Sequence, residues 1–97
     1  MSTLVSLAVF PMDKGESVSP YVARVVRLIR ESGLPHGVGP MGTVIEGGTD
    51  EVMTLVRRCF EDLERDCERV YMVLTADYRK GGGGRIEKKV RSVLDKL

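Results

Sequence analysis

The residues with the clearest chemical potential lie in the middle of the chain, where several glycines occur close together. Residues 37–42 (Gly-Val-Gly-Pro-Met-Gly) match the pattern G-x-G-x-x-G. In dinucleotide-binding proteins this pattern follows a strand and opens a helix, so that the pyrophosphate meets the helix N-terminus. Here the β-branched run 43–46 follows, which favours a strand. We therefore expect the glycines to form a tight joint between two strands, or to let a ligand approach the backbone closely.

Charged residues gather near two expected strand ends. Glu46 and Asp77 each fall near such an end, and Arg79 follows Asp77 by two positions. Arg79 opens the run 79–85, Arg-Lys-Gly-Gly-Gly-Gly-Arg, directly before an expected helix. Free N–H groups, the helix dipole and three cations could hold an anion there. Because the run lacks the spacing and the Ser or Thr of a P-loop, a mobile, solvated connector is the alternative.

No residue set in the sequence points to a metal site or to nucleophilic catalysis. His36 is the one histidine, and it has no companion cysteine or second histidine to complete a metal site. No Ser–His–acid or Cys–His set has a useful spacing, so we expect no catalytic residue and no cofactor. Cys59 and Cys67 fall in one expected helix, about 12 Å apart, which predicts two reduced thiols and no disulfide.

The elements that must position these residues follow from hydrophobic periodicity and from Gly and Pro. The spacing of apolar residues in 52–67, at positions three and four apart, is the clearest helical pattern. Ser19 and Pro20 favour a helix start, and Gly33 favours its end. The expected strands are residues 3–10, 34–39, 41–46 and 69–77, and the expected helices are 19–33, 49–67 and 85–97.

This order, β-α-β-β-α-β-α, is the ferredoxin-like α+β pattern with an extra C-terminal helix. The length of 97 residues corresponds to one domain, residues 1–97. A formal net charge of +1 argues against nucleic-acid binding through bulk charge, and no apolar run is long enough to span a membrane. The N-terminus lacks the features of a secretory signal, so we expect a cytoplasmic protein.

The expected sheet has apolar residues on both faces, although two helices can cover only one. Along the first strand, Leu4, Ala8 and Phe10 alternate with an equally apolar set. A sheet with one wet face would alternate clearly between apolar and polar residues. We therefore expect the second face to be covered, either by the third helix or by another copy of the chain packed face to face.

Several short motifs together resemble the thiamine-binding protein family, which includes the YkoF-like and MTH1187-like proteins. The motifs are a strand ending in Pro11, Ser19-x-Tyr21-Val22-Ala23, Met41-Gly42-Thr43-x-x-Glu46, Val70-Tyr71 and Asp77-x-Arg79. The resemblance covers essentially the whole chain, and the Met-Gly-Thr step with its downstream Glu is its most specific part. It implies a ferredoxin-like fold and binding of thiamine or its hydroxymethylpyrimidine half, without catalysis. It also implies homodimers or homotetramers assembled through the sheet faces.

The residues are chemically compatible with such a ligand. Thr43 can give and accept hydrogen bonds, and backbone groups beside Gly39 and Gly42 can reach the edge of an aminopyrimidine. Glu46 or Asp77 can balance the thiazolium charge. The remaining candidates are Met41 beside Gly42, Ser6 on the first strand, Tyr21 as a stacking ring, and Arg79. Because Thr43 and Glu46 have opposite strand parity, they cannot line one face without a bulge, and Thr43 is the stronger candidate.

Two other functions were weighed on the same fold. In an acylphosphatase-like enzyme, Arg79 or Arg85 would grip phosphate. That chemistry needs a glycine-rich turn near the N-terminus and an amide side chain to position water, but residues 11–15 hold one glycine and the chain has no Asn or Gln. An RNA-binding sheet needs aromatic residues on its central strands, and Phe10 with Tyr71 are too few.

Overall fold

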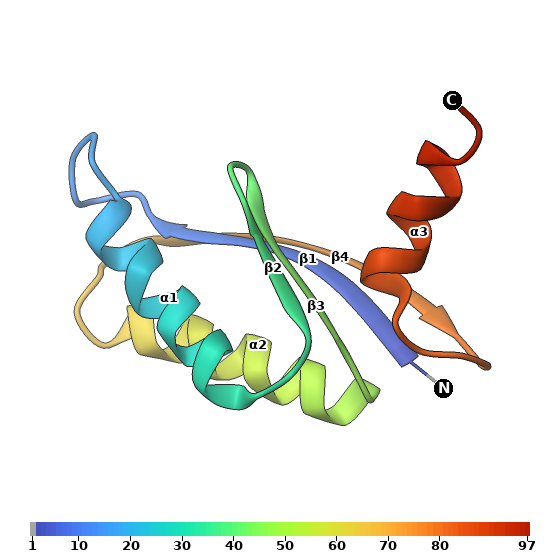
Figure 1. The fold of residues 1–97 in the computed structure, drawn as a ribbon. Coiled ribbons are helices and arrows are strands. Elements are labelled where there is room, and N and C mark those ends of the chain that lie inside the picture. The colour runs from blue at the N-terminus through green and yellow to red at the C-terminus, as the bar shows by residue number, and fades with distance from the viewer. Residues whose placement is uncertain (1) are drawn as a thin grey trace.

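Residues 2–97 are described by a computed structural model, and their elements follow the order expected from the sequence. The elements are β1 (Ser2–Pro11), α1 (Ser19–Ser32), β2 (His36–Gly39), β3 (Gly42–Gly47), α2 (Thr49–Glu64), β4 (Val70–Arg79) and α3 (Arg85–Leu94). The strands form one antiparallel sheet in the order β2-β3-β1-β4. In Figure 1, α1 and α2 lie together on one side of this sheet, and α3 stands apart near the N-terminal end of β1. The ferredoxin-like prediction with an extra C-terminal helix is confirmed.

The strand register decides which side chains share a face. Thr43 on β3 lies opposite Leu7 on β1, whose side chain is buried under the helices. Glu46 on β3 lies opposite Leu4, and Leu4 lies opposite Asp77 on β4. Since successive side chains of a strand point to opposite faces, Thr43 faces α1 and α2, and Glu46 and Asp77 face away from them. We call these the helix face and the open face.

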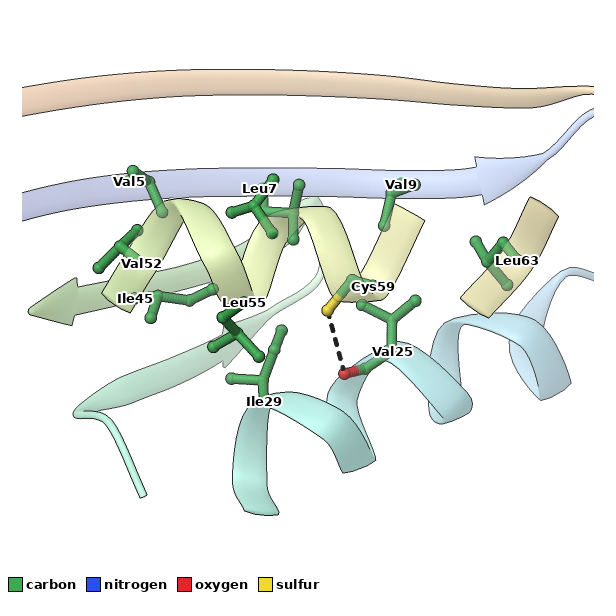
Figure 2. Packing of buried hydrophobic residues seen from close by; sticks show 11 residues of the cluster. Val5, Leu7, Val9, Val25, Ile29, Ile45, Val52, Leu55, Cys59 and Leu63 are labelled. Atoms are coloured by element: carbon green, nitrogen blue, oxygen red, sulfur yellow. Dashed lines mark hydrogen bonds between the residues drawn. The ribbon is translucent and has the colours of Figure 1, made fainter. Parts of the chain in front are cut away.

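The hydrophobic core fills the space between the helix face and the two helices (Figure 2). Its buried members are Val5, Leu7, Val9, Val25, Ile29, Ile45, Val52, Leu55, Val56, Cys59 and Leu63. Cys59 Sγ lies 4.0 Å from the carbonyl oxygen of Val25 on α1. Burial raises the pKa of the Cys59 thiol to about 11, so this thiol is neutral and behaves as a small apolar side chain.

Several boundaries differ from the sequence expectations. Val18, not Ser19, is the N-cap of α1, and its carbonyl accepts the N–H groups of Tyr21 and Val22. α2 ends at Glu64, so Cys67 lies beyond the helix and not on it as expected. Gly33 does adopt the left-handed conformation expected after α1, with φ of 76°. These differences are of one to three residues, and at α2 they place the last residue of the apolar stripe, Cys67, three residues beyond the helix end.

The open face is covered by α3 at one end alone. Arg85, the first residue of α3, is buried against that end, but the apolar residues farther along the helix are exposed. These exposed residues are Val90, Val93, Leu94 and Leu97. Nearer the other end of the open face, Tyr71 and Val73 on β4 are each about half exposed. The expectation that α3 covers the open face is therefore confirmed only at the end of the face where Glu46 and Asp77 lie, on either side of Leu4.

Candidate functional site

An apolar pocket lies between α1, the C-terminal half of β1 and the tip of the β2–β3 hairpin. Its cavity volume is about 280 Å³. Fourteen residues line it: Leu7, Ala8, Val9, Phe10, Val18, Val22, Val25, Val26, Val38, Gly39, Pro40, Met41, Gly42 and Thr43. Among these, Thr43 is the one residue whose side chain carries a hydroxyl, amide or charged group. The pocket therefore offers one directional polar side chain within otherwise apolar walls, which is a common arrangement for a small-molecule site.

The hairpin tip gives the pocket its wall and its mouth. Gly42 has a φ of 156°, and a Cβ there would lie 2.9 Å from the carbonyl oxygen of Leu7. Glycine therefore lets β3 approach the backbone of β1 closely at this position. Met41, the preceding residue, is 88% exposed. The exposed Met41 side chain lies at the edge of the apolar pocket. Exposed apolar surface of this kind is typical of a place where another apolar group binds.

Four of the residues proposed from the sequence, Gly39, Met41, Gly42 and Thr43, meet at this pocket. The other five lie elsewhere. Ser6 is exposed on the open face, opposite Val44 and Thr75. Tyr21 packs beside the core, and the Arg24 guanidinium lies 5.6 Å from its ring centre. Tyr21 is thus engaged with a side chain of its own helix and does not line the pocket.

Glu46 belongs to a buried charge cluster at the opposite end of β3. Its Oε1 accepts the backbone N–H of Arg85 at 2.9 Å, and its Oε2 lies 3.8 Å from Arg85 Nε. Both side chains are about 95% buried. The Arg85 guanidinium also donates to the Ser2 hydroxyl, to the Ser2 carbonyl and to the Asp77 carbonyl, at 2.6–3.0 Å. The cluster fastens the first turn of α3 to the sheet.

Asp77 completes this cluster from β4. Its Oδ2 lies 2.6 Å from Lys89 Nζ and 3.1 Å from Arg85 Nη1. The hydrogen bond from Lys89, helped by the charge of Arg85, lowers the pKa of Asp77 below its ordinary value. The carboxylates of Glu46 and Asp77 are therefore both paired with cations of α3. Arg79, two residues beyond Asp77, lies on the wall of an open groove between β4 and α3.

The run of four glycines connects β4 to α3. Gly82 and Gly84 have positive φ angles of 82° and 65°, which glycine adopts without strain. The N-terminus of α3 was considered as an anion site from the sequence. In the structure the Glu46 carboxylate accepts the first N–H of this helix, so a side chain of the protein already supplies an anion there.

Sequence reasoning missed the apolar walls of the pocket. Phe10, Val18, Val22 and Val26 line it, although the sequence analysis singled none of them out as ligand contacts. The available signal was weak, because valines at helical spacing are equally typical of a helix that packs on a core. Val22 is about one third exposed at the pocket, whereas Val25, three residues later on the same helix, is buried. The sequence alone does not distinguish the exposure of these two valines.

Together, the fold and the pocket define a small ferredoxin-like protein with an apolar pocket beside its β2–β3 hairpin. The family model of the thiamine-binding proteins matches residues 5–94. The chain is 40% identical over 94 residues to UPF0045 protein Mb1933 of Mycobacterium bovis, covering 96% of this chain and 92% of that protein. It is 30% identical over 90 residues to UPF0045 protein MJ1052 of Methanocaldococcus jannaschii, covering 93% and 90%. The chain belongs to the thiamine-binding protein family.

Solved structures agree with this assignment. The crystal structure of MJ1052 matches with a TM-score of 0.87 and 29% identity over 95% of both chains. A Thermotoga maritima protein, TM0486, provisionally described as a thiamine biosynthesis or salvage protein, matches with a TM-score of 0.84 and 30% identity, covering 96% of this chain and 99% of that one. The fold is therefore that of the family, and its thiamine-related role is the coarse functional conclusion.

Proposed function

We propose that this chain is a non-catalytic binder of thiamine or of its hydroxymethylpyrimidine half, and that the ligand sits in the pocket beside Thr43. The observation that carries the proposal is the meeting of Thr43, Gly42, Met41 and Gly39 around one apolar cavity. An aminopyrimidine ring has flat apolar faces and a polar edge. The valine-rich walls suit the faces, and Thr43 with the backbone of the hairpin suits the edge.

The charge of the lining favours the pyrimidine half over the thiazolium. No Asp, Glu, Lys, Arg or His lines the pocket, and burying an unpaired cation there would be costly. The thiazolium would therefore point toward the mouth and solvent. Glu46 and Asp77, expected to balance its charge, lie on the other face and at the other end of the sheet. They, with Ser6 and Arg79, would serve the same ligand only if a second protomer brought them to it.

Isothermal titration calorimetry with thiamine and with hydroxymethylpyrimidine tests the proposal. Thr43→Val keeps the shape of the side chain and removes its hydroxyl. We expect affinity to fall about 5- to 10-fold, corresponding to the loss of about 1 kcal/mol or slightly more from one hydrogen bond. Thr54→Val, on the exposed side of α2, is the matched control and should bind as the wild type. Absence of heat with both ligands at millimolar concentration would contradict the proposal.

The absence of catalysis is part of the same proposal. The acylphosphatase-like alternative needs an anion cradle in the loop after β1. Asp13 lies in that loop, and its carboxylate accepts the backbone N–H groups of Glu68 and Arg69 at 2.8 and 3.3 Å. The Glu68 N–H lowers the pKa of Asp13, so this loop carries a negative charge that would repel a phosphate group. This arrangement supports a binding role.

We also infer that the cytoplasmic protein assembles as a homodimer or homotetramer through the open faces of its sheets. Support comes from Tyr71 and Val73, large apolar residues about half exposed on that face, with Phe10 beside Tyr71 at a ring separation of 5.9 Å. Val73→Glu should therefore shift the mass measured by light scattering to that of the protomer. Thr54→Glu on α2 should not. A protomer mass for the wild type would contradict assembly without affecting the pocket proposal. Among residues 2–97, no helix is both long and apolar enough to cross a bilayer.

A further inference from the structure

A second concavity lies between the end of β4 and the face of α3 that carries Arg85 and Lys89, away from the Thr43 pocket. It is an open groove of about 650 Å³. Its lining consists of Asp77, Tyr78, Arg79, Arg85, Lys88, Lys89 and Ser92. None of these residues lines the Thr43 pocket, so the two concavities are separate in the protomer.

Positive charge is concentrated around this groove and is not a property of the whole chain. Residues 77–91 contain six of the fifteen basic residues and two of the fourteen acidic ones, although the net charge of the chain is +1. Four cations line the groove against one carboxylate, that of Asp77. A concave surface lined by charge of one sign raises the local concentration of counter-ions.

The internal ion pairs of the groove leave two of its cations available. Asp77 is already bound by Arg85 and Lys89, and Arg85 is saturated by Ser2, by the Asp77 carbonyl and by the two carboxylates. Arg79 and Lys88 form no ion pair within residues 2–97. Both line the groove, where the hydroxyl-bearing residues Tyr78 and Ser92 also lie.

We propose that this groove binds the phosphate group of a small phosphorylated molecule, with Arg79 and Lys88 as its charged contacts. Arginine presents a planar fork of donors that matches phosphate oxygens, and lysine adds a point charge. Hydroxyl groups of Tyr78 and Ser92 supply further donors. The volume exceeds that of a phosphate ion, so the rest of the ligand also fits in the groove.

The proposed phosphate site does not use the N-terminus of α3, because Glu46 already accepts the first N–H there. It depends on the side chains of β4 and of the second and third turns of α3. It is also independent of the thiamine proposal, since Thr43 contributes nothing to this groove.

The test is titration of the full chain with inorganic pyrophosphate, followed by calorimetry and by amide chemical shifts in NMR spectra. We expect shifts confined to residues 77–92 and an affinity that weakens as sodium chloride is added. Arg79→Ala and Lys88→Ala should each reduce affinity about 3- to 10-fold, and the double variant should reduce it further. Arg27→Ala, an exposed arginine on α1, is the control for nonspecific loss of charge.

The proposal is overturned if pyrophosphate at 10 mM causes no shifts, or if Arg27→Ala weakens binding as much as the two groove variants. It is also overturned if the shifts map to the Thr43 pocket. Thr43→Val should bind pyrophosphate as the wild type does, so failure of the groove and failure of the thiamine site are distinguishable. Circular dichroism of each variant establishes that α3 is still folded.

Discussion

The two ends of β3 differ sharply, although Thr43 and Glu46 are three residues apart. At one end, Thr43 faces an apolar pocket with no charged residue in its lining. At the other end, Glu46 is buried in a charge cluster with Arg85 on the opposite face of the sheet. The comparison indicates that one short strand provides part of an apolar pocket wall at one end and a structural attachment at the other. Of the two polar residues of the Met-Gly-Thr-x-x-Glu motif, Thr43 lines the pocket and Glu46 pairs with Arg85.

The difference arises from what covers each end. The pocket end is bordered by α1 and by a hairpin tip with a nearly fully exposed methionine, so its surface is incompletely buried within one protomer. The charged end is covered by the first residue of α3, and its hydrogen bonds are nearly complete. Among the buried side-chain atoms of residues 2–97, Glu46 Oε2 is the one without a hydrogen-bond partner. At the charged end most buried polar atoms thus have partners within the chain, whereas the Thr43 side chain, although only 6% exposed, borders a cavity that a ligand could enter.

The largest effect is expected from breaking the charged end. Arg85→Met removes the cation and leaves Glu46 buried without its counter-charge. Removing one partner of a buried ion pair typically costs about 3–5 kcal/mol, so the free energy of unfolding in urea should fall by roughly that amount. The pocket end should remain formed in the folded fraction. Lys89→Ala, which removes an exposed partner of Asp77, is the control and should cost less than about 1 kcal/mol. Equal stability of Arg85→Met and the wild type would refute the structural role.

A smaller effect is expected from distorting the pocket end. Gly42→Ala places a Cβ 2.9 Å from the Leu7 carbonyl oxygen, at a φ that disfavours a side chain. We expect a loss of about 1–3 kcal/mol in stability, together with loss of thiamine binding. Gly81→Ala is the matched control, because nothing lies within 4 Å of its added Cβ. If Gly42→Ala binds thiamine as the wild type does, the hairpin tip is not part of the site.

The smallest effect is expected from acid. Asp77 has a lowered pKa in the folded chain, so its stabilising contribution is complete above its unfolded pKa of about 4 and is lost as the pH falls toward the folded value. No residue that lines the Thr43 pocket titrates in this range. Hydrogen exchange should therefore accelerate in α3 before it accelerates in the β2–β3 hairpin. Asp77→Asn should abolish this difference in pH response. Simultaneous acceleration in both regions would show that the two ends are not independent.

Much of the fold could be predicted because it depends on local patterns. The apolar stripe of α2 and the continuous apolar run of β1 can both be read from residue spacing, and the opposite faces of Thr43 and Glu46 follow from strand parity. The position of α3 could not be predicted in this way. It depends on Arg85 reaching Glu46, which is 39 residues earlier, and on backbone carbonyls at Ser2 and Asp77. Such a cluster leaves no periodic signal in the sequence.

The candidate site was predictable in part for a similar reason. Gly39, Met41, Gly42 and Thr43 are adjacent in sequence, so a hairpin brings them together. Val22 and Phe10 reach the same pocket from α1 and β1, and only tertiary packing determines that they border a cavity. Ser6, Tyr21 and Arg79 were chosen for their chemical type, and the fold places each of them away from that cavity in the protomer.

The attachment of α3 mainly through its first residue, Arg85, has a practical consequence. Beyond its first turn the helix projects from the body of the protein (Figure 1), and Leu97, three residues past the helix end, is 95% exposed. A fluorescent dye placed on Lys96, two residues beyond the helix, would therefore sit at the tip of a projecting helix, distant from the core and from the hairpin. The rotational mobility of the dye would fall when another molecule contacts this helix, and the fold of the rest of the protein would not be disturbed by the label.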